Sequence, residues 1–423
     1  MIDKQIFAAL EITDSEVRLI VGEFFNTRFN IIKVERVACT GLASGKITDA
    51  RNIQQAVAKA AANASKLIGA SVQKVILAIP SFNMKRYSMK VTVPVEGIDQ
   101  TVTVNDIRSA IKKAQSVNIP DEYALIQTVC VKYTVNGITS RRIPLNERCS
   151  ELTVDIDLIC ADRDLSFGLV SCVEQAGLQV MDIFMDVYAV AKEAALFEQA
   201  VDRRIIILKI ERDTTTLGLL NKGRLTTCFV QPEGVGTFAG ALVDKYGLKR
   251  SHAVELVKYS ARLDEKVLSD NPVYIWRDGN GMTNKITEKE LVECIQPAVN
   301  KWTDEMQELC TPILQAGQTA VIITGDGGEM QGFNTLLQKR LNTDVKNYVP
   351  ETLGGRNAGL TACLGLFYAY KDKLPITGYA DSSLDMTAFI KAVSYREKKN
   401  GEKEDTITNK LKGILFEGKK QER

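Results

Sequence analysis

The chain has 423 residues, which is enough for two to four units with cores of their own. Hydrophobic residues make up 45% and charged residues 25%, as in ordinary soluble globular proteins, and the net charge of +2 predicts no strong overall attraction to nucleic acid or membrane. The single histidine, His252, excludes a histidine-cluster metal site and argues against a Ser-His-Asp hydrolase. Nine cysteines without a CxxC pair indicate reduced cytosolic thiols. The first residues lack the shape of a signal peptide, and no apolar run approaches the roughly 20 residues of a membrane-spanning helix.

The first part of the chain alternates strands with helices. Residues 6–39 alternate polar and apolar side chains and predict a three-strand meander. A helix follows over 49–70, with Asp49 or Asn52 near its start and Gly69 at its end, and then a buried strand over 72–80. This order begins an α/β layered unit.

A compact α+β insertion is predicted next, over roughly 84–162, from the order strand, helix, strand, strand. Residues 165–200 return to helix, strand and helix, and a second meander then begins at Ile205. Two meanders, each followed by helices, indicate an internal duplication.

Helices are predicted after the second meander, including a long one over 287–317 that is interrupted around Pro297. A buried strand then runs into a glycine turn and a helix over 318–341. Beyond about residue 371 the sequence is polar, charged and poor in apolar residues, which predicts a linker.

The second meander opens with a stretch, residues 205–225, that has the outline of a phosphate-binding hairpin. An apolar strand leads into a tight turn that ends in Thr214-Thr215, and a second apolar strand leads out. The turn itself carries Glu211, Arg212 and Asp213, where a phosphate loop favours glycine. The outline therefore predicts the hairpin but not its ligand.

Two weaker motifs lie downstream. Gly325, Gly327 and Gly328 follow a strand and precede a helix, so they allow either close approach of a ligand or a plain strand-turn-helix connection. Glu255 and Lys258 lie three apart on one helical face, and a surface ion pair explains that spacing as well as a binding role.

The tail is more specific. Residues 405–420 place Ile407, Leu411, Ile414 and Leu415 on one helical face, flanked by Phe416, with Lys410 and Lys412 among them. A short isolated helix is marginal in water. Its apolar face suits a membrane surface, where cationic side chains on an anionic leaflet add about 1 kcal/mol each. Docking on the protein's own body or in a partner's groove stays open.

Together these pieces resemble FtsA, the actin-like bacterial division protein that tethers FtsZ to the membrane. The resemblance runs nearly end to end and includes the stretches NIPDEYALIQTVCVKYTVNG, QPEGVGTFAGALVDKYGLKRSHAVELVK and IITGDGG. It implies a two-lobed α/β fold of the actin, Hsp70 and sugar kinase class with an FtsA-type α+β inserted subdomain. The implied boundaries are 1–83 for the first lobe, 84–162 for the inserted subdomain, 163–195 for the return to the first lobe, 196–234 for the second-lobe core, 235–305 for its small subdomain, 306–350 for the core again, 351–372 for the C-terminal helix of the body, 373–404 for a flexible linker and 405–423 for an amphipathic membrane-targeting helix.

The resemblance also implies where a nucleotide would bind, with two hairpins on its phosphates and an adenosine loop on its base. In the first hairpin Glu11 stands where the family has Asp, Thr13 replaces a glycine, Asp14 replaces a small hydroxyl residue, Glu16 replaces a lysine, and Ser15 keeps a hydroxyl. In the second, Lys209 replaces an acid, Glu211, Arg212 and Asp213 replace glycines, Thr216 replaces an Asp, and Thr214 and Thr215 survive. Glu255, Lys258, Gly325, Gly327 and Gly328 match the adenosine side.

These replacements oppose a triphosphate. Two like charges about 4 Å apart repel by about 4 kcal/mol at an effective dielectric constant near 20, and Asp14, Glu16, Glu211 and Asp213 would all face the anion. Arg212 and Lys209 offset part of this by pairing with the acids or reaching a phosphate. We therefore expect loss of ATP hydrolysis, no catalytic residue, and magnesium only together with a nucleotide. ATP binding itself is left open.

The function implied by the resemblance is a division adaptor at the cytoplasmic face of the membrane. Its implied partners are FtsZ, anionic lipids, further copies of the chain in actin-like filaments, and other divisome proteins through the inserted subdomain, with no nucleic acid. Two alternatives share the fold. One is an active ATPase or chaperone-like machine, which the lost glycines oppose, and the other is a pilus-assembly adaptor, which the terminal helix opposes.

Overall fold

A computed structural model describes residues 4–25, 28–96, 99–264, 267–277, 281–378 and 382–392. Its first lobe is built on a five-stranded sheet of order β11-β6-β1-β2-β3, in which β1, β6 and β11 run parallel. The bounds are Lys4–Ile12 for β1, Glu16–Phe25 for β2, Arg28–Ala38 for β3, Lys74–Ile79 for β6 and Gln179–Met185 for β11, with the short pair β4, Leu42–Ala43, and β5, Lys46–Ile47, beside them.

The second lobe repeats this pattern with a sheet of order β14-β13-β12-β17-β18. Here β12, β13 and β14 form an antiparallel meander, and β17 and β18 run parallel to β12. The duplication predicted from the sequence is therefore confirmed. The bounds are Arg204–Ile210 for β12, Thr215–Asn221 for β13, Arg224–Gln231 for β14, Thr319–Gly325 for β17 and Asp344–Asn347 for β18.

Helices cover the first lobe. Helix α1 begins where the Asp49 carboxylate accepts the amide of Asn52, and it ends at Gly69, whose φ of 86° suits glycine. Helix α10 packs on α4, so the end of the described body returns to the first lobe. The bounds are Ala50–Ile68 for α1, Arg163–Gln175 for α3, Asp186–Glu193 for α4, Leu196–Gln199 for α5 and Thr361–Thr377 for α10.

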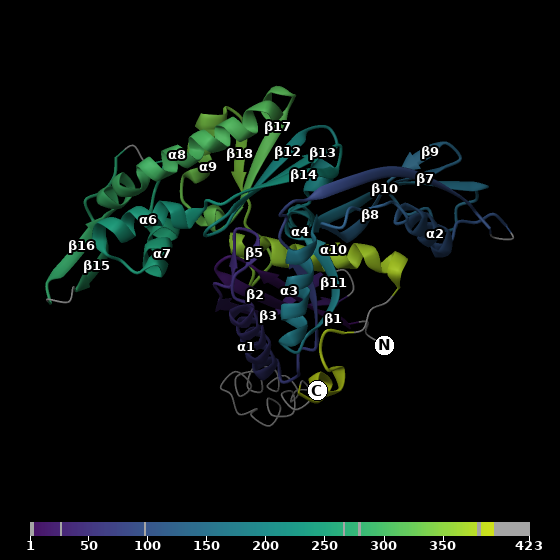
Figure 1. The fold of residues 1–423 in the computed structure, drawn as a ribbon, viewed down its shortest axis with the longest axis horizontal. Helices are drawn as coiled ribbons and strands as arrows, with labels where there is room; N and C mark the ends of the chain where they lie inside the picture. The colour runs from purple at the N-terminus through teal and green to yellow at the C-terminus, as the bar shows by residue number, and fades with distance from the viewer. Residues whose placement is uncertain are drawn as a thin grey trace, which may run out of the picture.

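The inserted subdomain is a four-stranded sheet of order β7-β10-β8-β9 with α2 against it and a small apolar core of its own. It projects to one side of the two lobes, and the outer helices of the second lobe project to the other (Figure 1). The bounds are Lys85–Pro94 for β7, Val104–Ala114 for α2, Tyr123–Val135 for β8, Ile138–Ser140 for β9 and Glu151–Asp162 for β10.

The outer part of the second lobe contains α6, α7, the hairpin β15–β16 and α8. Helix α8 is continuous, so the predicted interruption around Pro297 is wrong. Ile295, Val299 and Trp302 on either side of that proline are fully buried, and their packing offsets the roughly 3 kcal/mol that an internal proline costs. The bounds are Val235–Tyr246 for α6, Arg250–Ser260 for α7, Pro272–Arg277 for β15, Thr283–Thr287 for β16, Glu288–Gln315 for α8, Asp326–Glu329 for η1, Phe333–Leu341 for α9 and Ala358–Leu360 for η2.

The predicted linker over 373–404 begins too early. Helix α10 continues to Thr377, and residues 382–392 pack on the first lobe. Leu384 is only 3% exposed and forms a bridge with Val72, while Ser383 accepts the amide of Ala8. The stretch is polar on average, but its few apolar side chains pack on the first lobe, and this is why composition wrongly predicts a linker here. The predicted membrane helix over 405–423 lies outside the described residues.

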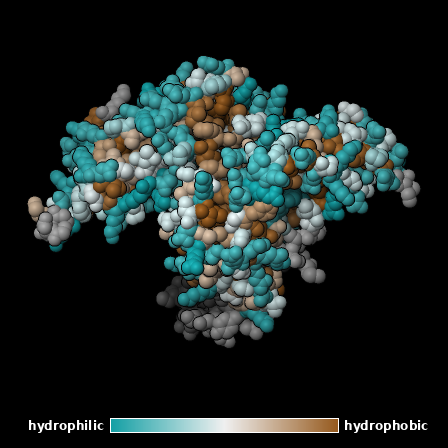
Figure 2. Space-filling model, in the orientation of Figure 1, coloured by the Kyte–Doolittle hydropathy of each residue, from teal (hydrophilic) through white to brown (hydrophobic). Residues whose placement is uncertain are grey.

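The hydrophobic surface is not evenly spread. On the face shown in Figure 2 the two projecting arms are mainly hydrophilic, while hydrophobic residues gather in a central band over β12 and β17. Within the described part of the chain, none of the helices is both long enough and apolar enough to cross a membrane.

Candidate functional site

Polar and charged residues gather at the carboxyl ends of the parallel strands, where the two sheets face each other. In the first lobe Glu11 is near the end of β1, Ser81 follows β6 and Asp186 follows β11. In the second lobe Lys209 is near the end of β12, and Asp326 follows β17. Open α/β sheets bind ligands outside the carboxyl ends of their strands, so this junction between the lobes is the candidate site.

Strand β12 is buried on both faces, and its alternation directs Lys209 towards the first lobe. Ile206, Leu208 and Ile210 join the second-lobe core, and Ile205 and Ile207 join the core of the first lobe. Lys209 continues the row that faces the first lobe, since strand side chains alternate.

The ammonium group of Lys209 is enclosed by carboxylates. Its Nζ lies 2.7 Å from Glu11 Oε1, 2.9 Å from Asp186 Oδ2 and 3.6 Å from Glu211 Oε1. Burial opposes the charge, but Asp186, Glu11 and Glu211 outweigh it and raise the pKa of Lys209 well above its ordinary value. Lys209 is therefore a fixed cation between the lobes.

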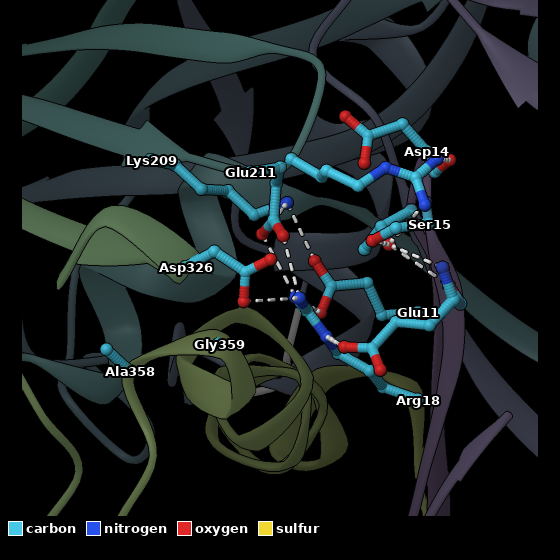
Figure 3. Close-up of polar contacts among 12 residues, drawn as sticks. Glu11, Asp14, Ser15, Arg18, Lys209, Glu211, Asp326, Ala358 and Gly359 are labelled. Carbon is cyan, nitrogen blue, oxygen red and sulfur yellow. Dashed lines mark hydrogen bonds and ion pairs between the residues drawn. The ribbon is translucent and has the colours of Figure 1, made fainter. Parts of the chain in front are cut away.

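Arg18 is the second internal cation and is 0% exposed. It lies directly opposite Glu11 in the β1–β2 ladder, and its guanidinium lies 3.2 Å from Glu11, 2.6 Å from Glu16, 2.7 Å from Glu211 and 3.9 Å from Asp326 (Figure 3). Burial opposes its charge, but Glu211, Glu11 and Glu16 raise the pKa of Arg18 well above its ordinary value. Arg18 thus joins two carboxylates of each lobe.

Two further groups close the edges of this network. Arg36 binds both oxygens of Glu16, and although burial alone would raise the pKa of Glu16, Arg18 and Arg36 lower it to about 2. The hydroxyl of Ser81 donates to Asp186. Four cations therefore face five carboxylates, namely Arg18, Arg36, Lys209 and Lys258 against Glu11, Glu16, Asp186, Glu211 and Asp326.

The tips of the two hairpins meet directly. Asp14 Oδ2 accepts the amide of Asp213 at 2.8 Å and the hydroxyl of Thr214 at 3.0 Å. Burial, together with the charges of Glu211 and Asp213, raises the pKa of Asp14 to about 7. Ser15 lies at the same tip and donates its amide to the hydroxyl of Thr13.

The residues predicted for the adenosine side lie on α7 and in the turn after β17, and these two segments contact each other. The Lys258 ammonium is buried and donates to Asp326 at 2.8 Å, whereas Glu255 on the same helix is exposed. A Cβ on Gly325 would lie 2.5 Å from the carbonyl oxygen of Ile210, and one on Gly327 would contact the Ile210 side chain. Gly328 approaches Ala358 in the same way, so these glycines serve packing of the chain on itself.

This geometry does not fit a magnesium-bound phosphate. The carboxylates that would face a cation already surround Lys209 and Arg18, and like-charged acids line the hairpin tips. Within the described ranges, no group of three or more histidine, cysteine, aspartate or glutamate side chains is arranged to hold a metal ion. The charged groups of this site join the two lobes to each other.

The sequence patterns single out Glu11, Lys209 and Glu211 but not Arg18, Asp186 and Asp326. One signal for Arg18 is present, because it is a charge inside the otherwise apolar run Val17–Val21. Asp186 similarly interrupts a buried stretch. A charge inside a buried apolar stretch requires a partner, and that requirement is the signal that the sequence offers for Arg18 and Asp186.

The architecture defines an actin-like protein. PilM in the PilM-PilN type IV pilus biogenesis complex covers 85% of this chain and 97% of its own, with a TM-score of 0.56 at 16% identity. MreB5 of Spiroplasma citri bound to ADP covers 89% and 99%, with a TM-score of 0.52 at 14% identity. The predicted two-lobed fold with an inserted subdomain is thereby confirmed.

The particular relatives are FtsA proteins. Residues 83–160 match the family model of the SHS2 domain inserted in FtsA. Cell division protein FtsA of Bacillus subtilis strain 168 is 25% identical over 375 residues, covering 86% of this chain and 83% of that protein. Cell division protein FtsA of Escherichia coli K12 is 21% identical over 404 residues, covering 92% and 95%. The chain is therefore FtsA-like along most of its length, as the sequence predicted, and these relatives support an FtsA-like role in cell division.

Proposed function

We propose that this chain is an FtsA-like division adaptor whose body works as a fixed scaffold, without ATP hydrolysis. The observation that carries the proposal is the position of Lys209 and Arg18. The Lys209 ammonium and the Arg18 guanidinium each lie buried between carboxylates that come from both lobes. These internal cations already pair with the carboxylates that a magnesium ion would need. Regulation then comes from partners and from the membrane.

The proposed tether has two ends. The tail over 405–423 binds the inner face of the membrane at the division site, and the small subdomain over 235–305 binds the tail of FtsZ. The proposed FtsZ-binding site is supported, within the described residues, by the hairpin β15–β16. There Tyr274 stacks on Trp276, and Ile275 and Met282 are exposed. Tyr274 and Trp276 pack partly against the second-lobe core, and large exposed apolar residues such as Ile275 and Met282 are typical of sites for protein partners.

Self-association is part of the same proposal. Copies of an actin-like body that assemble into filaments would bring many weak tail helices to one membrane, where each rebinds at high effective concentration. The FtsA-like and actin-like character of the body supports this step.

The inserted subdomain is proposed to contact other divisome proteins. A cavity of about 1030 Å³ lies among this subdomain, the first lobe and the β13–β14 turn of the second lobe. Apolar side chains such as Ile126 and Phe184 line it together with cationic ones such as Arg142 and Lys371. A mixed apolar and cationic lining supports contact with a partner segment that carries acidic groups.

The membrane end is tested by sedimentation with anionic liposomes. The full chain is expected to pellet with vesicles that contain phosphatidylglycerol, and a chain truncated after residue 404 is expected to stay in the supernatant. Neutral vesicles and high salt are the matched controls, because the cationic contribution is screened by salt. Equal pelleting of the full and truncated chains would overturn the proposal.

The proposed absence of nucleotide binding is tested by titrating ATP and ADP into the purified chain with and without magnesium. No binding at millimolar nucleotide is expected. Micromolar, magnesium-dependent binding would instead favour the ATPase alternative. Phosphate release that is lost in Asp213→Ala would confirm that alternative.

A further inference from the structure

The contact between the two hairpin tips occupies hydrogen-bond donors of the second hairpin. The second hairpin offers the backbone amide of Asp213 and the hydroxyl of Thr214, and both donate to the same oxygen, Asp14 Oδ2. Arg212 adds its guanidinium, which donates to the carbonyl oxygen of Asp14 at 2.8 Å. The amide and the hydroxyl thus converge on one oxygen, as such donors do on an oxyanion, and the guanidinium holds the backbone of the same residue.

The occupant comes from the other lobe. Asp14 lies in the turn between β1 and β2, it is only 6% exposed, and its carboxyl group contacts the second hairpin. Its second oxygen, Oδ1, is buried and has no hydrogen-bond partner among the described residues. The carboxylate therefore belongs to the second hairpin by its contacts, although it belongs to the first by sequence.

The start of helix α6, which packs against the same hairpin, is satisfied in the same way. The amide of Val235 donates to the Glu211 carbonyl at 3.1 Å, and the amide of Gly236 donates to the Arg212 carbonyl at 2.6 Å. The Asp213 carboxylate lies against Gly236 and is held by Arg212, at 2.9 Å, and by Arg250. Donors that could receive an external anion are thus used by the chain itself.

We propose that Asp14 is an internal ligand, whose carboxyl group occupies the amide and hydroxyl donors of the second hairpin, excludes phosphate from them and joins the two lobes. The inference extends the nucleotide-free scaffold proposed above, and it requires neither membrane nor FtsZ binding. Lys209 and Arg18 supply the internal cations of the same junction, so both the anion and the cations of the cleft are the chain's own.

The test replaces Asp14 by the small hydroxyl residue serine in the full chain and measures binding of inorganic pyrophosphate by calorimetry. The wild-type chain is expected to show no saturable binding. Asp14→Ser is expected to bind pyrophosphate in the submillimolar range, and Asp14→Ser with Asp213→Ser more tightly, because that change removes a second carboxylate and frees Arg250. Adding Arg212→Ala to Asp14→Ser is expected to abolish the gain.

A second measurement keeps the proposal testable if the serine variant binds nothing because the hairpin rearranges. Hydrogen exchange over residues 211–216 is expected to be faster in Asp14→Ser than in wild type, because the Asp213 amide loses its acceptor. Asp14→Asn, which keeps an oxygen acceptor, should retain wild-type protection. Unchanged exchange in Asp14→Ser, or saturable pyrophosphate binding by the wild-type chain, would overturn the proposal. Liposome sedimentation of the same variants separates this failure from failure of the proposed adaptor role.

Discussion

At the scale of single residues, Arg18 is the central cation of the buried ion-pair network. It is fully buried and lies within ion-pair distance of four carboxylates. Such a cation is held by its partners rather than being a net source of stability, since the desolvation of each ion is comparable to the attraction it gains. Removing one side of the network should therefore cost far more than removing both.

We predict that Arg18→Leu lowers the free energy of unfolding by about 3–5 kcal/mol, because Glu11 and Glu211 would then be buried with less compensation. Adding Glu211→Leu should restore part of that loss. Urea denaturation of the three chains measures both effects. Arg36→Leu is the control, since its partly exposed ion pair with Glu16 should contribute only about 0–1 kcal/mol. A loss for Arg18→Leu no larger than the control's would contradict the network's role.

Asp14 gives stability an unusual pH dependence. Its pKa rises from an ordinary 3.8 to about 7 on folding, so the folded chain holds the proton more tightly than the unfolded chain. Stability from this group is therefore greatest below about pH 4 and is lost as the pH rises to about 7. Glu16 acts oppositely and over a lower range, because its folded pKa of about 2 adds stability as the pH rises towards 4.5.

We predict that the stability difference between wild type and Asp14→Asn shifts by up to about 3 kcal/mol between about pH 5 and pH 8, in favour of the variant at the higher pH. The sign follows because the amide cannot acquire the charge that Glu211 and Asp213 oppose. Urea midpoints across this range measure it. A pH-independent difference would show that Asp14 titrates normally.

At the scale of elements, the sequence could predict the meanders, the insertion and the first helix because their signals are local. The alternation in residues 6–39 and the caps of α1 at Asp49 and Gly69 are visible in the residues themselves. The partners of Lys209 were not predictable in this way. They come from β1, α4 and the second hairpin, and only the folded chain brings these together.

In the segment over 382–392, the local sequence signal is misleading. Its composition is that of a linker, yet Ser383 is inserted between the amino ends of β1 and β6 and accepts hydrogen bonds from Ala8, Gln73 and Lys74. A few apolar residues and backbone hydrogen bonds are enough to dock this segment on the first lobe. Hydrophobic periodicity in the sequence does not predict such docking.

We predict that Leu384→Ala lowers the free energy of unfolding by about 2–4 kcal/mol, because its side chain is buried in the first-lobe core. Ile390→Ala in the same segment is the matched control, since that side chain is 59% exposed and should change stability little. Thermal unfolding of both variants compares them. Equal and small effects would mean that the segment behaves as the linker that its composition suggests.

At the scale of the whole molecule, the two lobes share more than the ion network. Ile205, Ile207, Leu220 and Leu225 from the second-lobe meander belong to the hydrophobic core of the first lobe. Lobes that share an apolar core and a buried network cannot separate without exposing both. The body should therefore lack the opening and closing that a bound nucleotide would control.

This argument predicts that the two lobes unfold together in calorimetry, with a midpoint that ATP and magnesium leave unchanged. A ligand that binds only the folded chain would raise the midpoint, so an unchanged value at millimolar ATP reports the absence of binding. Salt should also have little effect, because buried ion pairs are screened far less than exposed ones. Lys209→Met is the informative variant, since it leaves the Glu11, Asp186 and Glu211 carboxylates with one cation fewer and should weaken the coupling between the lobes. Separate unfolding of the two lobes in the wild-type chain, or a midpoint that rises with magnesium and ATP, would show instead that the lobes move independently around a ligand.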